Sequence, residues 1–206
     1  MKINGIIGKK LGMSLIYDDS GNMLPVTLVQ AGPCTVTQVK TLAKDGYDSV
    51  QIGFSESKNL NSPQSGHQKR SGGQFSVLQE FQADDPDQIE VGQKITTEIF
   101  EENEKIKVSG TTKGRGFSGG VRRYGFKGGP KTHGQSDRHR AVGSIGAGSS
   151  PGRVWPGTRM PGRYGNEKAT IKGLSIAKID SKNNILVIKG SIPGHNGSNV
   201  RIEIQK

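Results

Sequence analysis

Residues 105–127 read KIKVSGTTKGRGFSGGVRRYGFK, and the character of the chain changes within this stretch. Residues 105–109 alternate polar and apolar side chains, which is typical of a half-buried β-strand. From Lys113 onward the stretch is rich in glycine and in basic residues. A strand that leads directly into basic, glycine-rich chain indicates a β-domain joined to a segment of a different kind.

The segment that begins at Lys113 is strongly basic. Residues 113–172 hold 13 of the 29 lysine and arginine residues but only two acids, Asp137 and Glu167. The other 146 residues carry 16 basic and 16 acidic side chains, so the net charge of +11 lies in this segment. It also contains 15 of the 31 glycines and too few apolar residues to bury a core of its own. We therefore expect a basic, extended arm that a polyanion orders.

Nucleic acid is the polyanion that this arm is expected to bind. A solvated tail and a membrane-surface patch are the alternatives for a long basic run. Aromatic residues are interleaved with the basic ones here, which a solubilising tail does not need. Lysine neutralises phosphate, while arginine planes and aromatic rings stack on unpaired bases. These aromatic residues are Phe117, Tyr124, Phe126, Trp155 and Tyr164.

Alternating apolar residues predict β-strands on both sides of the arm. The predicted strands are residues 3–17, 23–29, 35–40, 49–54, 75–78, 94–100, 105–109, 170–179, 185–189 and 200–204, with acidic turns at 18–22 and 84–87. The first four strands follow one another with no helix between them, which favours antiparallel pairing. We expect residues 1–112 and 169–206 to form one mainly β domain, a single antiparallel β-barrel, with residues 113–168 as its inserted arm.

Residues 58–73 interrupt the strand pattern. Proline and glycine bracket residues 64–71, where one or two helical turns fit. We expect a surface excursion of the barrel, and a second RNA contact through His67, Lys69 and Arg70 is the alternative.

Composition excludes several classes of protein. Length allows one domain, or one domain plus an appendage. The sequence has neither an apolar run of about 18 residues nor a signal-peptide pattern, so we expect a cytoplasmic protein without a membrane partner. The single cysteine, Cys34, excludes an internal disulfide, and we expect it to be buried in a strand. The four histidines lack metal-ligand spacing, so no metal is expected.

Residues 114–119, Gly-Arg-Gly-Phe-Ser-Gly, match the G-x-G-x-x-G pattern of dinucleotide-binding loops. Asp137 falls about where a ribose-binding acid would lie. However, residues 119–125 show no helical apolar period, and no βαβ unit surrounds them. The Gly-Lys-Ser/Thr of a phosphate-binding loop is absent as well. We therefore expect neither a cofactor nor a small-molecule substrate.

Three Pro-Gly pairs recur five residues apart, each with an arginine beside it. They are Pro151-Gly152, Pro156-Gly157 and Pro161-Gly162, with Arg153, Arg159 and Arg163. Each pair favours a turn, which excludes a helix and predicts an extended, repeatedly bent chain. Such a chain suits an irregular RNA surface. The alternative, a disordered linker, suits a chain end better than an insertion anchored at both ends.

Residues 111–127 resemble the signature of the third large-subunit ribosomal protein, the universal family called ribosomal protein L-three. The resemblance covers the entire chain, and the short length is similar to that of the bacterial-type branch. The other matching stretches are residues 8–13, 132–134, 136, 139–140, 143–146, 151–153, 160–162, 165–167 and 189–194.

The resemblance implies a structural constituent of the large ribosomal subunit, located in the cytoplasmic ribosome. It implies binding of large-subunit rRNA early in assembly, with the arm directed from a surface barrel toward the peptidyl transferase centre. The barrel would resemble those of translation factors and reductases. The implied partners are large-subunit rRNA and neighbouring large-subunit proteins, without homo-oligomers. In some bacterial members a methylated glutamine follows Gly-Ser-Ile-Gly; this chain has Ala147 there, which excludes that modification at this position.

Two groups of arm residues are expected to contact RNA. The rRNA-binding group is Lys113, Arg115, Phe117, Arg122, Arg123, Tyr124, Phe126, Lys127, Lys131, His133, Arg138, His139, Arg140, Arg153, Trp155, Arg159, Arg163 and Lys168. The tip, expected near the catalytic RNA, is Ser144, Ile145, Gly146, Ala147, Gly148, Ser149 and Ser150.

Two other functions compete with this interpretation. An RNA-modifying or repair enzyme needs a nucleophile with its base, a carboxylate pair or a metal cluster, and the arm has only two acids and two separated histidines, His133 and His139. A sequence-specific DNA-binding protein needs a recognition helix or a dimer signal, and the sequence shows neither. We therefore expect a structural RNA-binding protein and not an enzyme.

Overall fold

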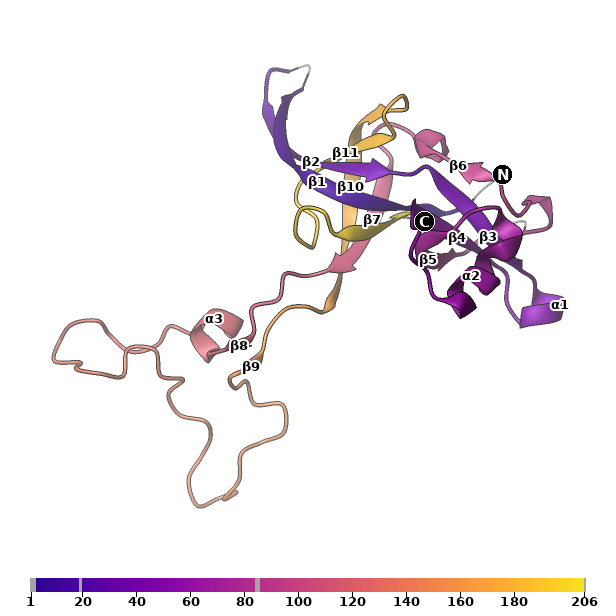
Figure 1. Cartoon of the computed structure of the whole chain (residues 1–206). Helices are drawn as coiled ribbons and strands as arrows, with labels where there is room; N and C mark the ends of the chain where they lie inside the picture. Colours follow the sequence, from indigo (N-terminus) through magenta and orange to yellow (C-terminus); the bar gives the residue numbers. More distant parts are fainter. Residues whose placement is uncertain (1–2, 19, 84–85, 206) are drawn as a thin grey trace. The chain divides into compact units, whose positions relative to one another are not determined.

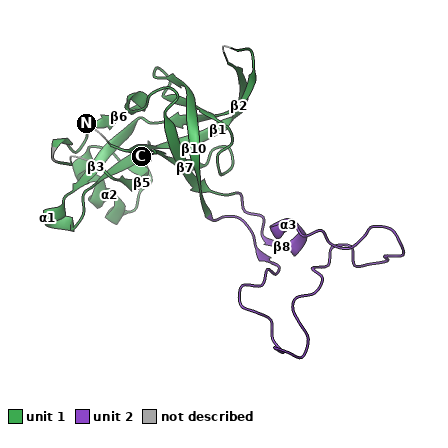
Figure 2. Ribbon diagram, turned by 180° about the vertical axis from the view of Figure 1, so that it is seen from behind, with its two compact units in different colours: residues 1–112, 168–206 green, residues 113–167 purple. Residues whose placement is uncertain are grey.

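The structure is a computed structural model that describes residues 3–18, 20–83 and 86–205, without the side chain of Asp87. Asp19, Asp84 and Asp85, which belong to the two predicted acidic turns, lie outside the described residues. The chain divides into two compact units (Figure 2). The barrel unit comprises the residues up to Thr112 and those from Lys168 onward, and the arm unit comprises residues 113–167.

A closed barrel of antiparallel strands is the centre of the barrel unit (Figure 1). Its strands, in order around the barrel, are β1 (Gly5–Tyr17), β12 (Asn199–Ile204), β7 (Lys105–Thr111), β10 (Lys168–Asp180), β11 (Ile185–Lys189) and β2 (Met23–Ala31). The first strand pairs with the last, with Ile6 opposite Ile202. The predicted mainly β fold and antiparallel barrel are therefore confirmed.

A second sheet contains the strands between the two parts of the barrel. Its order is β5 (Phe75–Phe81), β4 (Ser49–Glu56), β3 (Cys34–Lys40) and β6 (Lys94–Ile95). The expectation that all strands close a single barrel is wrong for these four. The change of sheet falls at Gly32 and Pro33, where proline has no N–H to continue the ladder of β2.

One hydrophobic core spans the barrel and the second sheet. Ile6 and Ile202 from the barrel and Ile52 and Phe81 from the sheet are fully buried in the same cluster. Alternation along each strand sends one face into this core, which is why the strand positions could be predicted. Cys34 is buried in β3, as predicted, and burial raises the pKa of its thiol to about 12 despite a hydrogen bond to the Ile7 carbonyl.

Short helices occupy the connections. They are α1 (Leu42–Asp45), α2 (Ser62–Gln68), and the 3-10 turns η1 (Lys69–Ser71), η2 (Pro86–Gln88) and η3 (Thr97–Ile99). Helices α2 and η1 fill the middle of the 58–73 interruption. The buried Gln68 connects α2 to β5 through two hydrogen bonds. Its side-chain amide donates to the Phe75 carbonyl at 3.1 Å and accepts from the Phe75 N–H at 2.6 Å.

The predicted strand at residues 94–100 is wrong beyond Ile95. Strand β6 ends there, and η3 follows after one residue. Both Ile95 and Phe100 are buried in the core. Residues five apart in a strand point to opposite faces of the sheet, so a continuous strand would expose one of the two. The 3-10 turn brings both side chains into the core.

The arm unit contains three short elements, β8 (Phe117–Ser118), α3 (Gly120–Tyr124) and β9 (Gly162–Arg163). Most of its remaining residues form turns and irregular chain. Across the described part of the protein, no helix has the length and apolar character needed to cross a membrane.

Candidate nucleic-acid interface

The arm unit begins and ends in two chains that run antiparallel. The Arg115 N–H donates to the Tyr164 carbonyl at 2.8 Å, and the Tyr164 N–H donates to the Gly116 carbonyl at 2.9 Å. Strands β8 and β9 continue this pairing, with Phe117 opposite Arg163. The base of the arm unit is therefore a hydrogen-bonded ribbon.

This ribbon changes the interpretation of the Pro-Gly repeat. Turns lie at Pro151 and at Pro156-Gly157, as predicted. The third pair is an exception, because Gly162 belongs to β9 and pairs with Ser118. A Cβ on Gly162 would lie 2.6 Å from Nη1 of Arg123, so a side chain there would displace this guanidinium.

Helix α3 corrects the expectation that residues 119–125 are not helical. The helix is held by packing, not by an apolar period along its sequence. A Cβ on Gly120 would lie 2.9 Å from the Phe126 ring and 3.2 Å from Val142, so both side chains pack closely on this glycine. Arg123 of the helix donates from Nη1 to the Met160 carbonyl at 3.0 Å. Because β8 and β9 are antiparallel, α3 does not create the βαβ unit of a dinucleotide site.

Arginine and aromatic side chains stack on each other within the arm unit. Tyr124 has two arginine neighbours, with the guanidinium carbons of Arg123 and Arg159 at 4.9 and 5.4 Å from its ring centre. The corresponding distances are 5.2 Å for Arg115 and Tyr164 and 4.8 Å for Arg153 and Trp155. A guanidinium stacked on a ring keeps its N–H groups in a fixed plane, which suits bidentate binding of phosphate.

The predicted rRNA-binding residues are mostly exposed. Phe117 is 82% and Trp155 55% exposed, although both are large aromatic residues. Arg123, Tyr124, Phe126 and His139 are the half-buried members of the group, because they pack within the arm unit. Lys168 differs in position, since it begins β10 of the barrel unit. The remaining members, all exposed in the arm unit, are Lys113, Arg115, Arg122, Lys127, Lys131, His133, Arg138, Arg140, Arg153, Arg159 and Arg163.

The predicted tip, residues 144–150, is an exposed loop. The Ser144 hydroxyl donates to the Gly146 carbonyl at 3.0 Å, and the Gly152 N–H donates to the Gly148 carbonyl at 3.3 Å. After the tip, the Thr158 hydroxyl donates to the Trp155 carbonyl at 2.7 Å and closes the turn that follows the tryptophan. The tip and Trp155 are thus held in defined local turns.

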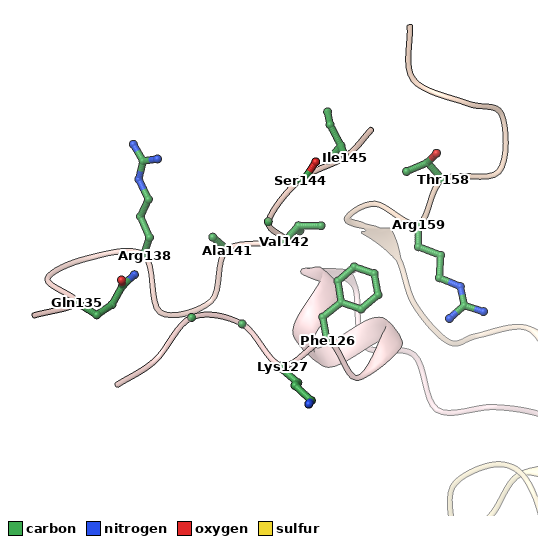
Figure 3. A pocket seen from close by; sticks show the side chains of 13 residues that line it. Phe126, Lys127, Gln135, Arg138, Ala141, Val142, Ser144, Ile145, Thr158 and Arg159 are labelled. Atoms are coloured by element: carbon green, nitrogen blue, oxygen red, sulfur yellow. The ribbon is translucent and has the colours of Figure 1, made fainter. Parts of the chain in front are cut away.

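A cavity of about 680 Å³, which we call the loop pocket, opens within the arm unit (Figure 3). Its lining comes from three segments, within residues 126–129, 135–145 and 158–159. The loop between the first two segments is closed by a hydrogen bond from the Gly129 N–H to the His139 carbonyl at 2.9 Å. Nδ1 of His139 lies 3.0 Å from the Pro130 carbonyl, to which its N–H donates.

The loop pocket includes residues that the sequence did not single out, notably Gln135, Ala141, Val142 and Thr158. Val142 is a β-branched residue close to a run rich in glycine and serine. Its presence there is the one signal in the local sequence of an apolar wall of the pocket. The other contacts that form the loop pocket join residues distant in sequence, so no local sequence pattern predicts them.

Some charged side chains of the barrel unit form ion pairs with one another. Nζ of Lys40 lies 2.7 Å from Glu80, and this hydrogen bond raises the pKa of Lys40 and lowers that of Glu80. Glu203 lies 2.9 Å from Arg201 and 3.5 Å from Lys107. Burial raises the pKa of Glu203, but the hydrogen bond and charge of Arg201, together with Lys107, hold it below its usual range.

The arm unit has a different balance of charge. It carries 11 lysine and arginine residues and two acidic residues, so most of its positive charge has no acidic counterpart in the same unit. Among the described residues, no three His, Cys, Asp or Glu side chains come together as a metal site.

Together, the fold and this charge distribution define a β-barrel protein with a cationic, glycine-rich insertion. Residues 58–184 match the family described as ribosomal protein L3. The large ribosomal subunit protein uL3 of Dehalococcoides mccartyi is 52% identical over 204 residues, which cover 99% of this chain and 98% of that relative. The uL3 protein of a Synechococcus strain is 52% identical over 197 residues, covering 94% and 91%. The uL3c protein of Cyanophora paradoxa is 52% identical over 196 residues, covering 94% and 93%.

The chain belongs to the ribosomal protein L3 family. It is therefore a structural component of the ribosome in the cytoplasm, with a role in translation, and not an enzyme. The family resemblance drawn from the sequence is confirmed, as is its relation to bacterial members.

Proposed function

We propose that this protein is built into the large ribosomal subunit by binding large-subunit rRNA through the arm unit. The observation that carries the proposal is the excess of 11 basic over two acidic residues in residues 113–167, with most of the basic side chains exposed. Lysine and arginine contacts to phosphate supply most of the affinity of such an interface and fix its position on the RNA. The barrel unit is then the folded base that anchors both ends of the arm.

The arm residues fall into three chemical groups, and each group has its own role. Exposed cations such as Lys113, Arg122 and Lys131 neutralise phosphates. Phe117 and Trp155 offer exposed rings for stacking on unpaired bases. Residues 144–150 carry no charged side chain, so their contribution is shape. By analogy with the family, we place this tip near the peptidyl transferase centre, where it supports the RNA fold without taking part in the chemistry.

Footprinting on naked large-subunit rRNA tests the proposal. A variant with Arg122, Arg140 and Arg163 changed to glutamine should lose the backbone protections that the wild-type protein gives. The matched control changes three exposed lysines of the barrel unit, Lys44, Lys105 and Lys182, to glutamine and should keep them. The opposite result, with loss only in the control, would move the RNA interface to the barrel unit and reject the proposal.

We also propose a neighbouring large-subunit protein as the partner of the β1–β2 hairpin, whose outer end extends away from the other barrel strands (Figure 1). Leu11, Met13, Leu15 and Tyr17 alternate along β1 and are 42 to 74% exposed, which places them on one face. Residues 11–28 contain two aspartates but no lysine or arginine, which favours a protein surface over RNA. Leu15→Asp should reduce incorporation into subunits and leave the affinity for naked rRNA unchanged; lowered rRNA affinity would contradict the assignment.

A further inference from the structure

We propose that the loop pocket receives a single nucleotide of the bound RNA, turned out of its stack. The base would lie against Phe126 and Val142, and the flanking phosphates would lie beside Lys127, Arg138 and Arg159. This inference rests on the proposed function, because it specifies how the arm unit recognises RNA.

The pocket is large enough for one nucleotide, and its walls suit a base. A cavity of about 680 Å³ lies within the usual range of small-ligand sites, roughly 300–1,000 Å³. Figure 3 shows Phe126 pointing toward Val142, with Thr158 on the opposite segment. Both Phe126 and Val142 pack on Gly120, and the Phe126 ring centre lies 5.8 Å from that of Tyr124. The apolar wall is therefore fixed by α3 before any ligand binds.

The charged residues around the pocket favour an anionic ligand. Lys127, Arg138 and Arg159 contribute to its lining, and none of the 13 lining residues is acidic. Arg159 is stacked on Tyr124, which holds its guanidinium in a fixed plane. An apolar wall beside three cations matches a nucleotide, which joins a flat aromatic base to a charged phosphate.

Polar groups in the lining can read the edge of a base. Gln135 brings a side-chain amide, which carries two donors and an acceptor and is therefore able to pair with a base edge. A Cβ on Gly129 would lie 3.1 Å from Nε2 of Gln135, so this amide lies close against the backbone of the loop. Its position is set by the loop that the Gly129 to His139 hydrogen bond closes.

The same features argue against other occupants. A base pair in a duplex keeps its faces stacked, so a pocket whose wall is a ring and a valine needs a base that has left its stack. An apolar side chain of a neighbouring protein would use the apolar wall but not the three cations, which makes it the less favourable occupant.

Filling the pocket tests this inference on the full-length protein. Ala141 is exposed and lines the pocket, so Ala141→Trp occupies the space without removing a cation. Ser136 is exposed in the same loop but does not line the pocket, so Ser136→Trp is the matched control. The probe is an in vitro transcript of large-subunit rRNA that contains 4-thiouridine, used both for affinity and for photocrosslinking.

We expect Ala141→Trp to weaken binding by about tenfold, the effect of losing one stacked base. The slope of log affinity against log salt should change little, because Ala141→Trp removes none of the arm's cations. Crosslinks to residues 126–142 should disappear in this variant and persist in Ser136→Trp. Phe126→Leu, which keeps an apolar wall but removes the ring, should weaken binding in the same direction.

Normal affinity and normal crosslinks in Ala141→Trp would overturn the pocket assignment, as would an equal loss in both tryptophan variants. A variant that binds naked rRNA normally but fails only in the presence of other subunit proteins would identify a protein occupant and also overturn it. If substitution of the arm cations leaves the rRNA binding of the protein unchanged, the proposed function itself is rejected. The two failures are therefore distinguishable.

Discussion

At the scale of single residues, Trp155 offers a test that separates the proposed docking on RNA from the proposed support of the catalytic RNA. Trp155 is 55% exposed, and the guanidinium carbon of Arg153 lies 4.8 Å from its ring centre. On the proposal that docking depends mainly on the arm's cations, we expect Trp155→Ala to enter large subunits at a nearly normal yield. Peptidyl transfer by those subunits, measured by puromycin reactivity, should fall several-fold, and Trp155→Phe should restore most of it. Lower yield with normal specific activity would mean that Trp155 serves assembly alone.

Gly128 illustrates a close approach of two chains in the arm unit. Its φ of +74° is unfavourable for residues with a side chain, and an added Cβ would collide with the His139 carbonyl. We expect Gly128→Ala to destabilise the loop by about 1–3 kcal/mol and to weaken rRNA binding, as measured by filter binding.

Gly134→Ala is the matched control for Gly128→Ala. Gly134 has a similar φ of +80°, but a Cβ there meets nothing within 4 Å. The control carries the cost of the backbone conformation without the collision, so its rRNA affinity should remain closer to that of the wild type. Equal losses in both variants would show that the close approach to His139 is not the cause.

Lys10 shows that a count of charged residues in a sequence does not tell which of them are buried. Its ammonium donates to the carbonyls of Ile192 and Gly194 at 2.9 and 3.2 Å, and the side chain is buried, whereas Lys9 beside it is exposed. The two family-like stretches at the ends of the chain meet through this lysine. The sequence identified both stretches, but only the fold shows that one of the two lysines has a structural role.

At the scale of elements, Glu203 of β12 predicts how the barrel responds to acid, because it forms ion pairs with Arg201 of the same strand and Lys107 of β7. The pKa of Glu203 is lowered in the folded protein, so its contribution to stability is complete above the unfolded value of about 4.3 and is lost as pH falls through the folded value. We expect the free energy of unfolding, measured with denaturant, to fall below about pH 4.3. Glu203→Gln should be less stable at pH 7 and should lose less on acidification.

Glu102→Gln, an exposed carboxylate in the turn before β7, is the control for this experiment. Its acid dependence should match that of the wild type. The pKa of Glu80 is also lowered, so the stability of Glu203→Gln should keep part of its dependence on pH. Wild-type and Glu203→Gln curves that stay parallel from pH 7 to 3 would show that Glu203 is not responsible.

Elements differ in how far the sequence predicts them, and the difference has a physical cause. Most strands of the barrel unit follow alternation along the chain, which is a local signal, and the sequence predicts their positions closely except for β6. The second sheet, η3 and α3 depend on contacts between distant residues. Helix α3, for example, needs Phe126 and Val142 on Gly120 and the Met160 carbonyl on Arg123. The loop pocket depends on the same kind of contact, so the sequence indicated its cations but not its shape.

At the scale of the whole molecule, the two units have different properties: the barrel unit supplies the stability of the fold, and the arm unit carries the excess positive charge. The barrel unit contains the hydrophobic core, and its described ion pairs include Lys40 with Glu80 and Arg201 with Glu203. The arm unit contains the excess of cations and is organised by stacked arginines and hydrogen bonds between its own backbone groups. Substitutions in one unit should therefore leave the main property of the other intact.

This division predicts that salt dependence belongs to the arm unit. Each phosphate neutralised contributes about −0.7 to −0.9 to the slope of log affinity against log salt, so engagement of roughly half of the arm's cations gives a wild-type slope of about −4 to −5. Thr111 of β7 pairs with Lys168 of β10, so a short Gly-Ser turn can replace residues 113–167 between neighbouring strands. The shortened protein should keep the barrel's thermal unfolding transition, while its rRNA binding becomes weak and nearly independent of salt. A shortened protein that folds and keeps the steep slope would place the phosphate contacts on the barrel unit.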